Sequence, residues 1–291
     1  MDLTDYNEIQ ALLRRNGFRF SKSMGQNFLV VPWVPEQIAE NAGLDKDTAV
    51  LEIGPGVGCL TEQLARRAGK VLAVELDRSL KGVLQETLGS YENVEVLFGD
   101  ILKQDIPSLV REHFGGMRAV VCANLPYNVT SPLLTALLRA DCFETMTVMI
   151  QREVARRICA APDTDDYGAF SLFVQWHAVP EMLFDVAPHC FHPQPKVTSS
   201  VIRLATRAEK PFPVSDEEFL FKIIRAAFNQ RRKTLPNALS AGTGLERSEI
   251  EQALEKCGYD TRIRGEALDM ASFVKIADEL AGKSGKPESV F

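Results

Sequence analysis

The sequence predicts an α/β protein in which a mostly parallel sheet is followed by a small all-helical domain. Between residues 49 and 160, apolar runs of strand length alternate with segments of helical periodicity. This alternation is typical of a parallel sheet that is covered by helices on both faces. From residue 216 onward the periodicity is helical only. A chain of 291 residues is long for one domain, so we expect one large domain and one smaller one.

The predicted sheet has seven strands. The strands that alternate with helices are expected at residues 49–53, 70–75, 94–98, 119–123 and 146–150. The segments 179–186 and 197–205 follow each other without a long crossover helix, so we expect a hairpin at the sheet edge. Around the strands, helices are expected at residues 34–44, 60–67, 79–88, 132–139 and 151–160.

Composition and charge give the predicted domain boundaries. The net charge is −6, yet between residues 9 and 29 there is no acid, and the cations there are Arg14, Arg15, Arg19 and Lys22. We therefore separate a basic N-terminal segment, 1–30, from the α/β domain, 31–207. Two prolines within the charged stretch 207–215 mark a linker, so the helical domain is expected at 208–282 and a flexible tail at 283–291.

Several classes of protein are disfavoured by composition. No run approaches the ~18 apolar residues of a membrane span, and the N-terminus "MDLTDYNEIQ" does not resemble a signal peptide. We expect a cytoplasmic protein with no membrane partner. The six cysteines form no C-x-x-C pair, and the four histidines have no zinc spacing, so reduced thiols and no metal site are predicted.

A glycine-rich loop follows the first predicted strand in "LEIGPGVGCLT". Gly54, Gly56 and Gly58 have G-x-G-x-G spacing before a helix, and such glycines let the backbone turn sharply and approach a ligand. Glu75 ends the second strand 21 residues after Gly54, where an acid can accept hydrogen bonds from both hydroxyls of a ribose. A tight turn without a ligand is the structural alternative.

Two classes of cofactor fit this loop. A dinucleotide usually requires G-x-G-x-x-G, and Cys59 occupies the last of those positions, which disfavours a nicotinamide cofactor. S-adenosylmethionine carries no phosphate, and Asp100, at the end of the third strand, is suited to its adenine amine. Strand-end carboxylates can also be solvated or cap the next helix, but ligands of open parallel sheets bind at this edge.

The fourth strand ends in "NLPY", at the same predicted edge. The oxygen of the Asn124 side chain and the carbonyl of Leu125 can accept from the two N–H groups of an exocyclic adenine amine, which draws its nitrogen toward tetrahedral geometry. Pro126 fixes the direction of that carbonyl, and Tyr127 offers a face on which the base can stack. Phe191, in "HCFHPQPKV", is a second aromatic that could clamp the other face of the base, or alternatively anchor its loop to the core.

In these motifs the chain resembles the rRNA adenine dimethyltransferases, specifically the KsgA type that acts on the small ribosomal subunit. The resemblance covers nearly the whole chain. It is carried by "GQNFL", "LEIGPGVGCLT", "AVELD", "GD", "NLPYN", "QREVARRI", "FHPQPKV" and "FNQRRKTL". It implies a Rossmann-like methyltransferase fold in residues 31–207, an RNA-binding helical domain in 208–282, and transfer of two methyl groups to each of two adjacent adenosines near the 3′ end of 16S rRNA.

The resemblance also implies roles for individual residues. The cofactor S-adenosylmethionine would be bound by Asn27, Leu29, Gly54, Gly56, Glu75, Asp100 and Asn124. The target base would be handled by Asn124, Leu125, Pro126 and Tyr127, with Phe191 as its stacking partner. Related adenine methyltransferases often have proline where this chain has Leu125, but only a backbone carbonyl is required at that position.

The basic residues gain a second interpretation from the resemblance. Charge runs are more often solvated surfaces, but on an otherwise acidic protein these cations can track RNA phosphates. The expected contacts are Arg14, Arg15, Arg19, Lys22, Arg152, Arg156, Arg231, Arg232 and Lys233. The expected partner is the small ribosomal subunit and not DNA.

Three alternatives remain open from the sequence. An Erm-like enzyme that modifies large-subunit rRNA shares the catalytic motifs, although "MGQNFL" and the helical tail favour the small subunit. A role mainly as an assembly checkpoint on the immature subunit is compatible with methylation. A nicotinamide oxidoreductase is the most distant alternative. We expect a monomer, because no heptad pattern or exposed apolar helix indicates an obligate dimer.

Overall fold

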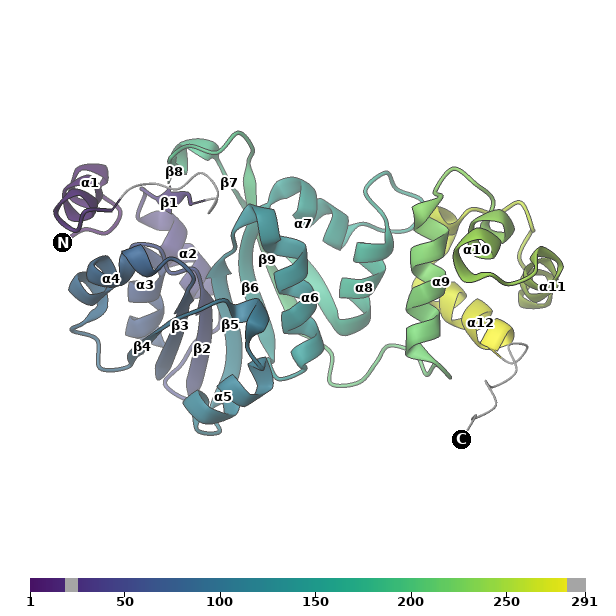
Figure 1. Ribbon diagram of the computed structural model, residues 1–291, viewed down its shortest axis with the longest axis horizontal. Helices are drawn as coiled ribbons and strands as arrows, with labels where there is room; N and C mark the ends of the chain where they lie inside the picture. The colour runs from purple at the N-terminus through teal and green to yellow at the C-terminus, as the bar shows by residue number, and fades with distance from the viewer. Residues whose placement is uncertain (19–25, 282–291) are drawn as a thin grey trace. The chain divides into compact units, whose positions relative to one another are not determined.

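The computed structural model describes residues 1–18 and 26–281, which form two compact units. The first unit contains residues 1–155 and 178–206, and the second contains residues 156–177 and the chain from 207 onward (Figure 1). Each unit has its own hydrophobic core. Within the described residues, none of the helices combines the length and apolar character needed to cross a bilayer.

The first unit is built on a seven-stranded sheet with the order β4-β3-β2-β5-β6-β9-β7. β9 pairs antiparallel with both β6 and β7, whereas the other neighbours are parallel. The predicted mostly parallel sheet with an edge hairpin is therefore confirmed. Its strands are β2 (Thr48–Ile53), β3 (Lys70–Glu75), β4 (Val94–Phe98), β5 (Arg118–Asn124), β6 (Thr145–Gln151), β7 (Ala178–Val186) and β9 (Ser199–Thr206).

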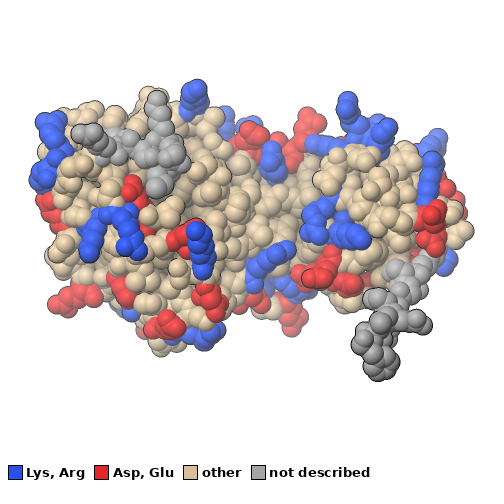
Figure 2. Space-filling model, in the orientation of Figure 1, with Lys and Arg blue, Asp and Glu red and all other residues tan. Residues whose placement is uncertain are grey.

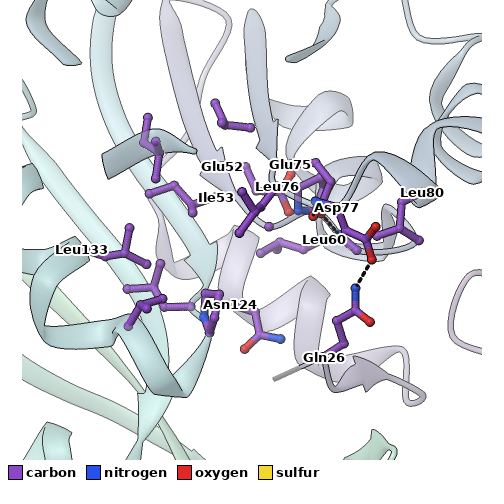
Figure 3. A pocket seen from close by; sticks show the side chains of 18 of the residues that line it. Gln26, Glu52, Ile53, Leu60, Glu75, Leu76, Asp77, Leu80, Asn124 and Leu133 are labelled. Carbon is purple, nitrogen blue, oxygen red and sulfur yellow. Dashed lines mark hydrogen bonds between the residues drawn. The ribbon is translucent and has the colours of Figure 1, made fainter. Parts of the chain in front are cut away.

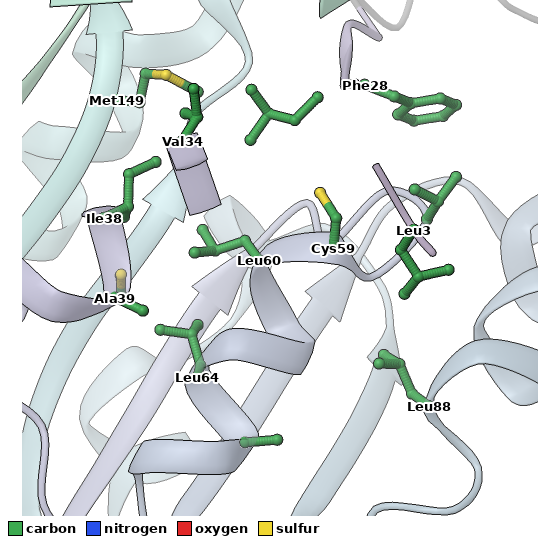
Figure 4. Close-up of a cluster of buried hydrophobic side chains, with 14 of the residues drawn as sticks. Leu3, Phe28, Val34, Ile38, Ala39, Cys59, Leu60, Leu64, Leu88 and Met149 are labelled. Carbon is green, nitrogen blue, oxygen red and sulfur yellow. The ribbon is translucent and has the colours of Figure 1, made fainter. Parts of the chain in front are cut away.

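Helices cover both faces of this sheet (Figure 1). One face packs on α2 (Trp33–Asn41), α3 (Cys59–Arg67) and α4 (Lys81–Leu88), and Figure 4 shows part of this cluster, with Ile38, Leu64 and Met149. The other face carries α5 (Ile106–Phe114) and α6 (Thr130–Ala140). The sequence analysis overlooked α5, although Asp105 precedes it, a proline lies in its first turn, and Gly115 ends it in the left-handed conformation.

The N-terminal residues belong to the core of the first unit. Ile9, Leu12 and Leu13 of α1 (Tyr6–Arg15) are buried in the same cluster as α2 to α4. Further along, β1 (Phe28–Leu29) pairs antiparallel with β8 (Phe191–His192). The prediction that 1–30 is a separate basic segment is therefore corrected, because the apolar face of α1 is packed against the α/β domain.

The strand order reverses between β2 and β5. After β2 the chain adds β3 and β4 on one side, and it then returns to add β5 and β6 on the other. At such a switch point the connections leave the strands in opposite directions, so a crevice opens at the carboxyl ends of the strands. Short 3₁₀ helices follow several strands there: η2 (Arg78–Leu80), η3 (Ile101–Lys103) and η4 (Tyr127–Val129), with η5 (Pro188–Cys190) preceding β8.

The second unit is helical. It contains α8 (Ala169–His177), α9 (Glu217–Asn229), α10 (Leu235–Thr243), α11 (Arg247–Cys257), η6 (Gly265–Ala267) and α12 (Met270–Ala281), and α7 (Arg152–Cys159) crosses from one unit to the other. The predicted boundary assigned all of 31–207 to the α/β domain, and this is wrong for residues 156–177. Tyr167 and Trp176 are fully buried in the core of the second unit, and the Tyr167 hydroxyl donates to the Leu268 carbonyl at 2.9 Å.

Two glycines allow close packing around α9. A Cβ on Gly242 of α10 would lie 2.5 Å from the Cβ of Ala226, and a Cβ on Gly265 would lie 2.8 Å from that of Ala227. Both distances are too short for carbon atoms. The pairing of small residues therefore sets how closely α9 and its neighbours pack in the second unit.

We predict that Gly242→Ala destabilises the second unit. Alanine normally stabilises a helix relative to glycine by about 0.5 to 1 kcal/mol, but the collision with Ala226 should cost more and give a net loss of roughly 1 to 3 kcal/mol. Denaturant unfolding of the full chain would measure this. Gly168→Ala is the control, because a Cβ there meets nothing within 4 Å. A more stable Gly242→Ala chain would contradict the packing argument.

Candidate active site

A cavity of about 260 Å³ lies at the carboxyl ends of β2, β3, β4 and β5 (Figure 3). It brings together residues from the N-terminal segment, the glycine loop and the ends of four strands. Ten of the predicted site residues line it: Asn27, Leu29, Gly54, Gly56, Glu75, Asp100, Asn124, Leu125, Pro126 and Tyr127. Residues far apart in the sequence thus meet at the edge where the sheet topology predicts a ligand.

The glycine loop is held between β3 and the N-terminal segment. The Gly54 amide donates to the Val74 carbonyl at 2.9 Å, which fixes the loop to β3. Gly56 has φ of +61°, and a Cβ there would lie 3.1 Å from the ring of Phe28. Glycine is therefore required at position 56 both for its conformation and for the contact with Phe28. That contact packs "GQNFL" onto the loop.

The carboxylate of Glu75 is held by backbone amides. It is only 6% exposed, Oε1 accepts from the Asp77 amide at 2.8 Å, and Oε2 accepts from the Gly56 amide at 3.4 Å. Burial raises the pKa of Glu75, while the two amides act in the opposite direction. Gln26 in turn donates to Asp77 at 2.8 Å (Figure 3). The acid at the end of β3 thus has a fixed orientation toward the cavity.

Glu52, which the sequence analysis did not select, also lines the cavity. It lies on the central strand β2, is 1% exposed, and its Oε2 has no hydrogen-bond partner within the described residues. Burial raises the pKa of Glu52 to about 8, and the nearby charge of Glu75 adds to this effect. Glu52 therefore carries a proton at neutral pH.

The ionisable side chains that line the cavity are acidic. Among its described lining residues, the ionisable carboxyl groups are those of Glu52, Glu75, Asp77 and Asp100, and there is no lysine, arginine or histidine. The ionised carboxylates among them would repel a phosphate and attract a cation. Within the described part of the chain, no cluster of His, Cys, Asp and Glu has the arrangement of a metal site.

Apolar side chains lie beside the strand-end acids. Leu76 follows Glu75 and is 55% exposed, and Leu102, two residues after Asp100, is 41% exposed. Both line the cavity, as does Ile101. The sequence analysis missed these residues, although an apolar side chain directly after each strand-end acid was a visible signal. They provide apolar surface for a flat ring.

The "NLPY" segment presents two acceptors to the cavity. Asn124 is the last residue of β5, and the Leu125 amide is bound to the Met149 carbonyl of β6 at 3.0 Å. Pro126 has φ of −60° and ψ of 127°, and its own carbonyl accepts from the Thr130 hydroxyl at 3.1 Å. Within the described residues, neither the Asn124 side-chain amide nor the Leu125 carbonyl is engaged by a hydrogen bond.

Tyr127 is positioned by a contact with β9. Its hydroxyl is hydrogen-bonded to the hydroxyl of Ser199, the first residue of that strand. Burial raises the pKa of Tyr127, so the phenol is neutral at physiological pH. Tyr127 lines the cavity while its hydroxyl is tied to β9, and this bond restrains the ring on which a base would stack.

Phe191 does not line the cavity. It is 3% exposed, pairs with Leu29 between β8 and β1, and packs in the core of the first unit. The prediction that it clamps the free face of a base is therefore corrected, because its ring is already enclosed by core side chains. The alternative considered from the sequence, that it anchors its loop, agrees with this packing.

Eight of the nine predicted RNA-contacting cations fall into three groups. Arg19 and Lys22 lie outside the described residues. Arg15 is paired with Glu86 (Nε to Oε1, 2.9 Å) and Arg152 with Asp185 at 3.6 Å. The remaining exposed cations, which have no acidic partner in the described part of the chain, are Arg14, Arg156, Arg232 and Lys233. Figure 2 shows cationic and acidic side chains interspersed on the visible face, without a continuous basic surface.

Arg231 has a structural role in the second unit. Its Nε donates to Glu266 at 2.6 Å, and its terminal nitrogens donate to the carbonyls of Asp165 and Thr164 at 2.6 and 2.9 Å. All of these partners belong to the second unit. The RNA contact of Arg231 stays a prediction, and the structure adds that its donors already hold the 164–165 turn.

We predict an unusual pH dependence of stability from Glu52. Its folded pKa is about 8 against an ordinary value of 4.5, so the folded chain holds one proton more than the unfolded chain between these values. The free energy of unfolding therefore falls as pH rises through this window, by roughly 3 kcal/mol from pH 5 to pH 8. Urea unfolding should show this loss in the wild type and not in Glu52→Gln.

The control for this experiment is Glu92→Gln, which removes an exposed carboxyl group. Its stability should follow the wild-type curve across the same pH range. Parallel curves for Glu52→Gln and the wild type would contradict a protonated Glu52.

Comparisons with known proteins match nearly the whole chain to one family of proteins. A family model described as "Ribosomal RNA adenine dimethylase" matches residues 17–281. A protein of Lachnoclostridium phytofermentans named ribosomal RNA small subunit methyltransferase A is 46% identical over 280 residues, covering 95% of this chain and 97% of the relative. The protein of that name from Geobacillus thermodenitrificans is 45% identical over 284 residues, covering 96% and 97%.

Solved structures show the same fold. The crystal structure of the 23S rRNA methyltransferase ErmE has a TM-score of 0.67 at 29% identity, and the match covers 88% of this chain and 100% of ErmE. A dimethyladenosine transferase from Plasmodium falciparum has a TM-score of 0.71 at 25% identity, with coverage of 88% and 98%. With the family model matching most of its length, the chain belongs to the ribosomal RNA adenine dimethylase family.

Proposed function

We propose that this methyltransferase uses S-adenosylmethionine to dimethylate the exocyclic amines of two adjacent adenosines near the 3′ end of 16S rRNA in the small ribosomal subunit. One observation carries the proposal. A cavity that contains four carboxyl groups and, among its described residues, no cationic side chain opens beside the unengaged acceptors of Asn124 and Leu125. Such a site suits a cationic methyl donor and an amine substrate.

Electrostatics favours this cofactor over a dinucleotide. S-adenosylmethionine carries a sulfonium and an ammonium group and no phosphate, so the acidic cavity attracts it. The pyrophosphate of a nicotinamide cofactor would be repelled, and Cys59 lines the cavity where a third glycine is usual. We assign Glu75 to the ribose hydroxyls and Asp100 to the adenine amine, with Leu76 and Leu102 against the adenine ring.

The remaining cofactor contacts follow from position. The N-terminal segment contributes Asn27 and Leu29, and the close approach of the backbone at Gly54 and Gly56 leaves room for the amino-acid end of the cofactor. Asn124 lies where β5 ends, between the cofactor strands and the "NLPY" turn. These assignments leave the acceptors of Asn124 and Leu125 for the target base.

Methyl transfer to adenine requires orientation more than a strong base. The lone pair of the amine is delocalised into the ring, and hydrogen bonds from its N–H groups to Asn124 and Leu125 draw the nitrogen toward tetrahedral geometry. Pro126 holds the Leu125 carbonyl in place, and Tyr127 supports the base with a stacking energy of roughly 1 to 3 kcal/mol. The nitrogen becomes acidic once the methyl group has arrived, so its proton is then lost readily.

The identity of the substrate is supported by the relatives. Those at 45% and 46% identity are named small-subunit methyltransferases, whereas ErmE, named for 23S rRNA, is 29% identical. We therefore favour the small subunit over the large-subunit alternative. We also propose that the helical second unit contributes RNA contacts through Arg156, Arg232 and Lys233, which have no acidic partner in the described chain.

Nucleoside mass spectrometry tests the substrate. The chain would be incubated with labelled S-adenosylmethionine and with unmethylated small subunits, large subunits or naked rRNA. We expect labelled dimethyladenosine from small subunits and at two adjacent positions. Label that appears only in the large subunit would contradict the assignment and favour the Erm-like alternative.

We predict that Asn124→Ala lowers kcat by about 10² to 10³, because one of the two acceptors on the amine is lost. Binding of S-adenosylhomocysteine, measured by calorimetry, should remain detectable. Asn41→Ala is the matched control, since the Asn41 side chain bonds only within α2, to the Gln37 carbonyl at 2.9 Å. Normal turnover by Asn124→Ala would refute the role of this side chain.

We also predict that the neighbouring cations 231 to 233 separate into two classes. The double variant Arg232→Ala, Lys233→Ala should weaken RNA binding and make the slope of log K against log[salt] shallower by about 1 to 2. Its free energy of unfolding should not change. Arg231→Ala should instead lower the free energy of unfolding by roughly 1 to 3 kcal/mol, because three acceptors lose the hydrogen bonds that Arg231 donates to them. Equal effects of the variants on both quantities would argue against this division.

A further inference from the structure

The two acceptors assigned to the amine do not by themselves identify the base. Cytosine, like adenine, has an exocyclic amine with two N–H groups, so the Asn124 oxygen and the Leu125 carbonyl suit both bases. The two bases differ in the ring atoms beside the amine. In adenine these are followed by the acceptors N1 and N7, whereas cytosine offers the acceptor N3 on one side and only a C–H group on the other. A donor that faces N7 therefore distinguishes adenine from cytosine.

Few side chains of the cavity can supply this donor. Among its described lining residues there is no lysine, arginine or histidine. On the side of the "NLPY" turn, the lining side chains with an N–H or O–H group are those of Asn124, Tyr127 and Asn128. The Tyr127 hydroxyl is already bonded to Ser199. A contact of Asn124 with both the amine and N7 would lie in the plane of the ring and hold the amine flat, which opposes methyl transfer.

Asn128 lies directly after the ring on which the base would stack. It belongs to η4, and its exposed side chain lines the cavity. The turn satisfies its own carbonyls, because the Thr130 hydroxyl is 3.1 Å from the Pro126 oxygen and 3.4 Å from the Tyr127 oxygen. Within the described part of the chain, by contrast, the side-chain amide of Asn128 has no hydrogen-bond partner. The turn thus presents an amide donor beside the stacking surface.

We propose that Asn128 is a further specificity-determining residue, whose side-chain amide donates a hydrogen bond to N7 of the target adenine. This inference rests on the proposed function and adds the ring atom by which the site selects its base. The amide has two N–H groups, of which one meets N7 while the other stays in contact with solvent. The base is then held at its amine, at its N7 edge and on one face. Together these contacts fix its rotation, which in-line methyl transfer requires.

A single-atom change in the RNA tests this contact. Small subunits would be reconstituted with 16S rRNA that carries 7-deazaadenosine at the two target positions, where a C–H group replaces N7. We expect kcat/KM of the wild type to fall roughly tenfold relative to unmodified subunits, because one hydrogen bond is lost. Asn128→Ala should show the same fall on unmodified subunits and no further fall on the 7-deaza subunits. Its affinity for S-adenosylhomocysteine, measured by calorimetry, should equal that of the wild type.

Two aspartate variants provide a matched pair. Asn128→Asp keeps the shape of the side chain but replaces the donor by a carboxylate oxygen that repels N7, so it should lose more than Asn128→Ala on unmodified subunits. On 7-deaza subunits this excess loss should disappear. Asn7→Asp makes the same charge change on α1, at an exposed position outside the cavity, and should behave as the wild type.

The outcomes separate this inference from the proposed function. Equal kcat/KM of the wild type on both kinds of subunit would overturn the inference alone. So would a penalty from 7-deazaadenosine that is as large in Asn128→Ala as in the wild type, since N7 would then be read by another group. Failure of the wild type to methylate unmodified small subunits would overturn the proposed function and the inference with it.

Discussion

The reversal of strand order between β2 and β5 is the constraint on which the cavity depends, because it makes the loops after these two strands run in opposite directions. Parallel pairing brings the carboxyl ends of β2, β3, β4 and β5 to one edge, and each strand delivers one functional segment there. If one strand were added in a different order, the glycine loop and "NLPY" would no longer face each other. The fold thus determines which residues meet, and the residues determine the chemistry.

The N-terminal segment supplies part of the cavity wall, beside the carboxyl ends of the strands. Phe28 packs against the glycine loop at Gly56, where a Cβ would lie only 3.1 Å from its ring, and Gln26 donates a hydrogen bond to Asp77 beside Glu75. The pairing of β1 with β8 ties this segment to the loop that contains Phe191. Phe191 is therefore better understood as a support for the cavity wall: its buried ring anchors the strand whose partner lines the cavity.

The central strands were predictable because they are buried on both faces and read as continuous apolar runs. The bounds of β3 and of the neighbouring, half-buried β4 agree with the prediction at both ends. Strand-end acids were likewise recognisable by position. Glu52 was not, because an acid inside such a run gives no sign of whether it is buried. Arg231 and Arg232 are neighbours of identical type, and only tertiary contacts distinguish the structural cation from the exposed one.

Dimethylation places opposing demands on the two proposed acceptors. The unmodified amine has two N–H groups and can satisfy both Asn124 and Leu125, whereas the singly methylated amine has only one. In the second transfer one acceptor must therefore face a methyl group and lose its hydrogen bond. Leu125 is held by the hydrogen bond from its amide to the Met149 carbonyl of β6 and by Pro126, so its carbonyl cannot turn away. The Asn124 side chain has no partner in the described chain that restrains it. The asymmetry between a fixed backbone acceptor and an adjustable side-chain acceptor thus allows one site to accommodate both forms of the substrate.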